Sequence, residues 1–162
     1  MSDAPANKEA RLLALEREES VSDLLRAAAQ LLVENLDGTA CAISRAIGDV
    51  LVLLVEYTRA HSVNSGHGYL ISDYPATRMV LEEEKPMAVA VSDPTADEQE
   101  VTLLRELGFD SLLMLSMVCG GELWGLVEVY DNRAGGFRAE DVVRAEGIVE
   151  RACAVLERLA AS

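Results

Sequence analysis

Hydrophobic residues dominate two runs near the C-terminal end of the chain, Ser111–Val118 and Leu123–Tyr130, and glycines at 120 and 121 separate them. Both runs are too apolar to alternate regularly with polar residues, as a strand with one face in water does. The pattern therefore predicts a β-hairpin that is covered on both faces. A sheet covered on both faces can hold a pocket.

The two ends of the chain have a helical spacing of apolar residues. Residues 9–36 predict a helix with a break near Ser20, where Ser20 and Asp23 have the spacing of a helix start. Residues 138–160 predict a second long helix. Its apolar seam comprises Val142, Val149, Leu156 and Leu159. The two helices could pack together on one sheet face, or the seam could form a bundle in a dimer.

The middle of the chain alternates β-rich runs with short amphipathic segments. Residues 39–46 and 50–59 flank a Gly-Asp turn, which predicts an antiparallel hairpin, and residues 61–73 predict a loop with one short strand. Three further elements are predicted: a helix over 76–84, a strand over 87–91 and a helix over 97–107. This order predicts an α+β domain with a mainly antiparallel sheet.

Charge and cysteine content limit the classes of partner. With 28 acidic and 14 basic residues the formal net charge is −14, and the basic residues form no run, so no nucleic-acid partner is expected. No stretch approaches the ~18 apolar residues that span a bilayer, so no membrane partner is expected. The three cysteines, Cys41, Cys119 and Cys153, are odd in number and widely spaced, which favours buried thiols in a reducing cytoplasm.

The order of these elements resembles the GAF domain, a small-molecule-sensing module of signalling proteins. The resemblance runs from about Ser20 to Leu159. The stretches that carry it are Ala76–Val89, Val91–Asp93, Leu107–Met117, Gly120–Tyr130 and Phe137–Asp141, followed by the last helix. Each stretch is a weak signal alone, but their order is typical of the family.

The resemblance implies a GAF-like, PAS-related fold with a central antiparallel sheet of about six strands. The terminal helices would pack on one face, and the pocket segments, residues 65–96, would lie on the other. Residues 1–8 are expected to be disordered, and residues 9–162 to form one domain with terminal helices 9–36 and 138–160. Members of the family bind cyclic nucleotides, bilins, haem or amino acids, whereas others only dimerise, so the family does not identify a ligand.

The resemblance also places candidate ligand contacts around the mouth and interior of that pocket. They are Tyr69, Tyr74, Arg78, Met79, Ser92, Asp93, Phe109 and Ser111. The guanidinium of Arg78 could clamp a carboxylate or a phosphate, or it could pair with Glu82 on the same helix face. Packing in the core is the alternative role for Phe109 and Ser111.

Motifs for catalysis, metal binding or cofactor attachment are not found. The signature of cyclic-nucleotide-binding members is absent, and Asp131–Arg133 is predicted to cap a turn. No cysteine has the neighbouring histidine that is common at bilin attachment sites. The histidines His61 and His67 are expected in a solvated loop, so no metal site is predicted and any cofactor is unknown.

The sequence therefore predicts a non-catalytic sensory or regulatory domain that binds a small molecule and signals through homodimeric terminal helices, with an output domain as a possible further partner. One alternative is a structural dimerisation module whose pocket is filled by its own side chains. A second is a thiol-dependent reductase of free methionine sulfoxide. That activity needs cysteines in the pocket segments, whereas Cys119 and Cys153 are predicted on a strand end and an apolar helix face as protonated, inert thiols.

Overall fold

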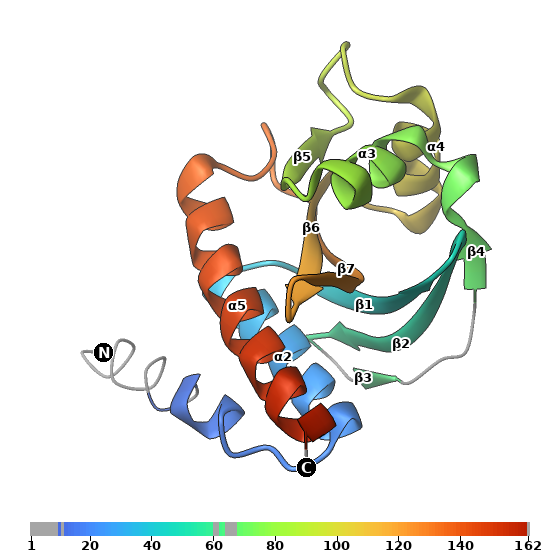
Figure 1. The fold of residues 1–162 in the computed structure, drawn as a ribbon. Helices are drawn as coiled ribbons and strands as arrows, with labels where there is room; N and C mark the ends of the chain where they lie inside the picture. The colour runs from blue at the N-terminus through green and yellow to red at the C-terminus, as the bar shows by residue number, and fades with distance from the viewer. Residues whose placement is uncertain (1–9, 11, 60–61, 64–67, 162) are drawn as a thin grey trace, which may run out of the picture.

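The computed structural model of the protein describes residues 10, 12–59, 62–63 and 68–161 (Figure 1). The expected disordered segment, residues 1–8, lies outside the described residues, as do His61 and His67. The helices and strands follow the predicted order, with the short strand β3 added. In sequence they are α2 (Val21–Leu36), β1 (Ala40–Ile47), β2 (Val50–Thr58), β3 (Ser62–Val63), β4 (Gly68–Leu70), a short 3-10 helix (Ile71–Asp73), α3 (Pro75–Glu83), β5 (Met87–Ala90), α4 (Glu98–Leu107), β6 (Ser111–Cys119), β7 (Glu122–Asp131) and α5 (Ala139–Ala161).

One antiparallel sheet forms the centre of the fold. Its strands run in the order β3-β2-β1-β7-β6-β5, and β4 pairs with β2 beside this path. The N-terminal and C-terminal hairpins therefore join edge to edge, with Cys41 of β1 opposite Val129 of β7. This arrangement confirms the predicted α+β class with its sheet of about six strands. The additional strands β3 and β4 are only two and three residues long.

The terminal helices α2 and α5 lie side by side across one face of the sheet (Figure 1). Alternate residues of the strands point toward them, such as Leu113 and Leu115 of β6, and join a core with the leucines of α2. The predicted seam of α5 packs into this same core. Val149 and Leu156 are buried there, and Val142 and Leu159 are partly buried against it. The seam is thus used within the chain.

Short elements cover the opposite face of the sheet. The helices α3 and α4 lie over this face, with α3 against β6 and β7, and a second buried cluster fills the space beneath them. Thr77 of α3 donates a hydrogen bond to the buried carboxylate of Glu100 of α4, which ties the two helices together. Both faces of the central hairpin are therefore covered, as its apolar sequence predicts.

Helix ends lie where the local sequence places them. The hydroxyl of Ser20 accepts a hydrogen bond from the backbone N–H of Asp23 at 3.1 Å, which caps the start of α2. Asp37 adopts a left-handed conformation at its end. Gly108 closes α4 with φ of 85°, a backbone angle that glycine adopts without steric cost. The turn between β6 and β7 likewise contains two glycines with positive φ.

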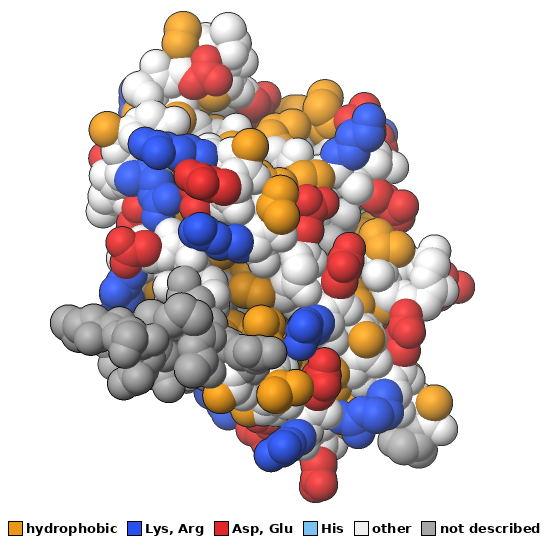
Figure 2. Space-filling view, turned by 90° about the vertical axis from the view of Figure 1, so that its left-hand side faces the viewer, with side chains coloured by type: hydrophobic (Ala, Val, Ile, Leu, Met, Phe, Trp, Pro, Cys, Tyr) orange, Lys and Arg blue, Asp and Glu red, His pale blue; other side chains and the backbone are white. Residues whose placement is uncertain are grey.

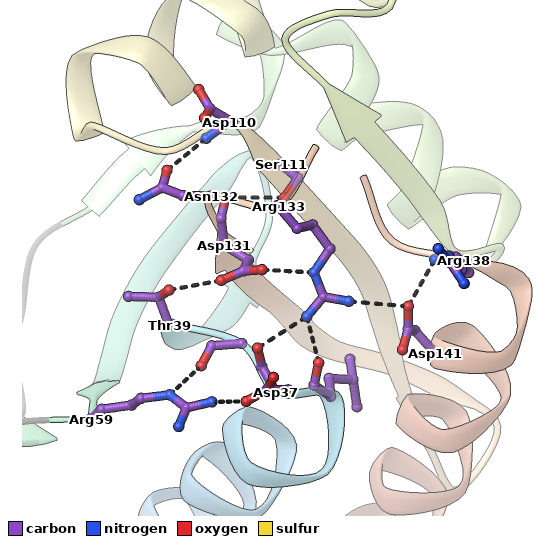
Figure 3. Close-up of polar contacts among 12 residues, drawn as sticks. Asp37, Thr39, Arg59, Asp110, Ser111, Asp131, Asn132, Arg133, Arg138 and Asp141 are labelled. Atoms are coloured by element: carbon purple, nitrogen blue, oxygen red, sulfur yellow. Dashed lines mark hydrogen bonds and ion pairs between the residues drawn. The ribbon is translucent and has the colours of Figure 1, made fainter. Parts of the chain in front are cut away.

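A polar network around Arg133 joins the ends of four elements (Figure 3). The Arg133 guanidinium pairs with Asp131 at 2.6 Å and with Asp141 of α5 at 3.3 Å, and it donates to the Leu36 carbonyl at the end of α2. Thr39, just before β1, donates to the other oxygen of Asp131 at 2.8 Å. The side chains of Asp131 and Arg133 thus make structural contacts at the end of β7.

Replacement of Arg133 by methionine is expected to lower the free energy of unfolding by about 2 kcal/mol, because it leaves two mostly buried carboxylates without their cation. The Arg133 side chain is 24% exposed, so solvent screens part of the interaction. For a chain of this length the melting temperature should fall by about 6 °C. Differential scanning calorimetry measures this shift. The control Arg26→Met removes an exposed pair with Asp23 and should change the melting temperature little.

Candidate functional site

A cavity of about 230 Å³ lies between the sheet and the segments that cover its second face. Its floor is formed by β1, β2 and β7, and its walls by Tyr69 of β4, Tyr74 and α4. The lining consists of Ala40, Ala42, Leu53, Glu56, Tyr69, Tyr74, Leu103, Leu107, Phe109, Glu128 and Tyr130. A hollow of about 220 Å³ between β6 and α5 contains no aromatic side chain. We therefore take the aromatic-lined cavity as the candidate site.

The most unusual residue in the cavity is Glu128, a carboxylate in the middle of β7. The residues on either side, Val127 and Val129, point toward the terminal helices, so the strand alternation points Glu128 toward the cavity. Its side chain is buried and accepts hydrogen bonds from the hydroxyls of Tyr69 at 2.8 Å and Tyr130 at 3.0 Å. Burial raises the pKa of Glu128 to about 7, although these two hydrogen bonds oppose the shift.

The tyrosines around Glu128 act as hydrogen-bond donors. Burial, reinforced by the negative charge of Glu128, raises the pKa of Tyr69 and of Tyr130 well above 10, so both hydroxyls keep their protons. The Ser44 hydroxyl is fully buried beside Tyr69 and lowers the pKa of that phenol. Among the described residues it makes no hydrogen bond of normal geometry.

Aromatic rings form two contacts around the cavity. Tyr69 and Tyr74 meet edge to face, with ring centroids 5.7 Å apart. Phe109 and Tyr130 are tilted by 30° with centroids 5.1 Å apart. Their sequence origins differ, since Tyr69 follows the N-terminal hairpin and Phe109 precedes β6. The fold thus brings aromatic residues from four segments to one site.

Three of the residues proposed from the sequence, Tyr69, Tyr74 and Phe109, line this cavity. The other five lie elsewhere. Arg78 and Met79 are exposed on α3, and Arg78 pairs with Glu82 at 2.8 Å, which was the alternative considered for it. Their roles as ligand contacts stay predictions.

The remaining proposed residues make contacts with their own neighbourhood. Ser92 and Asp93 are exposed in the turn after β5, where Asp93 accepts two hydrogen bonds from Thr95. Ser111 is buried at the start of β6, and its hydroxyl donates to the carbonyl oxygen of Asp131 at 3.0 Å. The Asp93 contacts stabilise the turn after β5, and the Ser111 contact joins β6 to β7.

Sequence reasoning missed Glu128 and Tyr130 as site residues. The signal was a single charged residue in the run Leu126–Tyr130, inside a hairpin predicted to be covered on both faces. A carboxylate in such a place must be buried, and a buried charge needs partners. Tyr130, two positions later, shares its face of the strand and supplies one of them.

All three cysteines lie on the side of the sheet that α2 and α5 cover, opposite the cavity. Cys119 and Cys153 are neighbours there, and their shared hydrogen bond lowers the pKa of Cys119 and raises that of Cys153. The sequence does not predict this contact between the two thiols, because residues distant in sequence meet where β6 ends against α5. Neither thiol reaches the cavity.

The described part of the chain contains neither a cluster of metal-binding side chains nor a helix that could span a membrane. Its His, Cys, Asp and Glu side chains form no group of three that could hold a metal ion. None of its helices combines the length and the apolar character that crossing a bilayer requires.

A single antiparallel sheet with terminal helices on one face and a covered cavity on the other defines an α+β class of fold that is suited to holding small molecules. The family model of the GAF domain matches residues 20–159. The chain therefore belongs to the GAF domain family. No curated protein matches the chain at a significant level.

Solved structures show the same fold at low sequence identity. A bacteriophytochrome, RpBphP3 from the photosynthetic bacterium R. palustris, has a TM-score of 0.82 and 11% identity over 98% of this chain, which spans 38% of that chain. The phycocyanobilin-bound GAF domain from a cyanobacterial phytochrome has a TM-score of 0.78 and 16% identity over 94% of both chains. A phycoerythrobilin-bound GAF domain from a cyanobacterial phytochrome also has a TM-score of 0.78, at 17% identity.

Proposed function

We propose that this protein is a non-catalytic sensory or regulatory domain that binds a small organic molecule in the cavity beneath α4. The observation that carries the proposal is the cavity itself, which has aromatic walls and a single buried carboxylate in its floor. A small number of precisely placed polar groups within an apolar lining is typical of ligand sites. The three free cysteines support the proposed cytoplasmic location.

The bilin-bound relatives suggest a chromophore as one candidate ligand, but the cavity favours a smaller one. Its volume of about 230 Å³ lies below the ~300–1,000 Å³ of typical ligand pockets, and a tetrapyrrole needs more space. The thiols of Cys41, Cys119 and Cys153 all point to the opposite side of the sheet. This arrangement disfavours both a bilin held through a thioether and thiol-dependent reduction of methionine sulfoxide in the cavity.

We further propose that the terminal helices transmit the signal, in a homodimer and to an output domain where one is present. This proposal is supported by strand β7, which contacts both the cavity and the helix layer. Its Glu128 lines the cavity, while Val127 and Val129 pack against the helices. The apolar seam of α5 is used within the chain, so dimer contacts would involve the outer faces. Figure 2 shows the side of the molecule that carries α5, where acidic and basic side chains interleave with small hydrophobic patches.

A thermal-shift screen tests the binding function. The compounds should cover nucleotides, amino acids, amines, haem and bilins, and a compound at about 100 times its Kd stabilises the protein by about 2.7 kcal/mol. Ala42→Leu adds bulk inside the cavity and should abolish the shift, whereas Ala88→Leu makes the same change on an exposed position of β5. A ligand that stabilises both variants equally binds elsewhere and contradicts the proposal.

The same samples address the alternative of a structural dimerisation module. Sedimentation velocity over a wide concentration range, with and without the best compound, separates a ligand-dependent dimer from a constant one. A dimer that forms without any stabilising compound in the screen favours the structural module. A strictly monomeric protein rules out transmission through dimeric helices.

A further inference from the structure

Aromatic residues are rare in this chain and concentrated in one place. The chain contains four tyrosines, two phenylalanines and one tryptophan. Four of these seven residues line the cavity: Tyr69, Tyr74, Phe109 and Tyr130. The face of an aromatic ring carries partial negative charge and attracts cations within about 6 Å. A cavity with four such rings favours a positively charged occupant.

The charged side chains that line the cavity also favour a positively charged ligand. Its two ionisable carboxyl groups are Glu56 and Glu128, and the described residues that line it include no lysine, arginine or histidine. Glu100 of α4 adds to the negative field at Glu128. A buried carboxylate is costly unless a cation pairs with it. Here the described part of the chain supplies tyrosine hydroxyls to Glu128 but no positive charge.

We propose that the cavity binds a small organic cation, such as an alkylammonium, quaternary ammonium or amidinium compound, with its charge against Glu128 and its apolar part between the aromatic rings. This inference rests on the binding function proposed above and names the chemistry of the ligand. An anionic ligand would be repelled by the carboxylates of Glu56 and Glu128. A neutral molecule would gain the aromatic contacts but leave Glu128 unpaired. The cavity volume of about 230 Å³ limits the cation to a small one.

The titration of Glu128 gives the binding a pH dependence. The titratable groups around this carboxyl are Tyr69 of β4, Tyr74 before α3, Glu100 of α4, Tyr130 of β7, Cys41 of β1 and, on the cavity floor, Glu56 of β2. Because the pKa of Glu128 is about 7, the carboxylate form that pairs with a fixed positive charge is a minor species at pH 6 and the major one at pH 8. The affinity for a quaternary ammonium ion should therefore rise about tenfold between these pH values.

Isothermal titration calorimetry on the full chain with matched pairs of compounds tests this inference. Choline is compared with its uncharged isostere 3,3-dimethylbutan-1-ol, and phenethylamine with 2-phenylethanol. At pH 8 each cation should bind at least about tenfold more tightly than its neutral partner. Glu128→Gln should remove most of that preference and the pH dependence. Glu82→Gln, which removes an exposed carboxylate on α3, should retain both.

A second variant keeps the test decisive if Glu128→Gln does not fold. Phe109→Leu removes one aromatic face and should weaken the cations more than the neutral compounds. Equal binding of both members of each pair, or binding of no cation at millimolar concentration, overturns the inference. The binding function itself survives that result if the broad screen finds a neutral or anionic ligand whose effect is lost in Ala42→Leu. A screen without any ligand removes both proposals.

Discussion

The Gly125→Ala variant is expected to lose about 3 kcal/mol of unfolding free energy, the largest loss expected for this change among the described glycines. Gly125 lies on β7 opposite Arg45 of β1, and a Cβ atom there would overlap the carbonyl oxygen of Ser44. That oxygen belongs to the backbone of the neighbouring strand, so no side-chain rotation can relieve the overlap. The two hairpins must separate at the centre of the sheet. Urea unfolding followed by circular dichroism measures the loss.

Gly147→Ala is the matched control for this change. Gly147 lies within α5, and a Cβ atom built on it meets nothing within 4 Å. Alanine is the better helix former, so this variant should gain about 0.5–1 kcal/mol. Two glycine-to-alanine changes with opposite signs would separate steric overlap from backbone propensity. A Gly125→Ala protein as stable as the unsubstituted chain would contradict the close approach of β1 and β7.

The second large effect is a dependence of stability on pH that comes from Glu128. The pKa of this carboxyl is raised from 4.5 to about 7 by burial in the folded protein. Between these values the unfolded chain releases the proton while the folded protein keeps it, so stability falls as pH rises. The stabilisation is complete below pH ~4.5 and lost above pH ~7. Its size is about 3 kcal/mol, because each pKa unit corresponds to about 1.4 kcal/mol.

Unfolding free energies of the unsubstituted chain and of Glu128→Gln, measured from pH 4.5 to 8, isolate this contribution. Glutamine keeps an oxygen that can accept a tyrosine hydroxyl but does not titrate. The advantage of the unsubstituted chain over the variant should shrink steadily as pH rises through this window. Glu82→Gln controls for the loss of one negative charge from the surface. A difference between the chain and Glu128→Gln that is constant with pH would show that Glu128 does not titrate in this range.

Most of the architecture could be predicted because local chemistry sets the ends of its elements. Gly108 and the pair at 120 and 121 end α4 and β6 where the sequence indicates. The strand β3 could not be predicted, since its two residues have no pattern of their own and pair with Glu56 and Tyr57 of β2. Such a pairing depends on the neighbouring strand and not on the segment itself.

The candidate site could be predicted less completely, for two physical reasons. The buried positions of α3 include Thr77 and Val80, so helical periodicity turns Arg78 and Met79 toward solvent. The contact of Tyr69 with Glu128 joins residues 59 apart in sequence, and only the folded sheet brings them together. Strand alternation within β7 could have identified Glu128, but its hydrogen-bond partners require the strand order.

The Arg133 network gives the two terminal helices a common attachment to the sheet. It joins the end of α2 and the start of α5 to the adjacent ends of β1 and β7. The 23 residues of α5 extend about 35 Å from it. A tilt of α5 by about 5° about this attachment would displace its C-terminal end by about 3 Å. Under the transmission proposed above, a movement of β7 beside the cavity would reach both terminal helices through this junction.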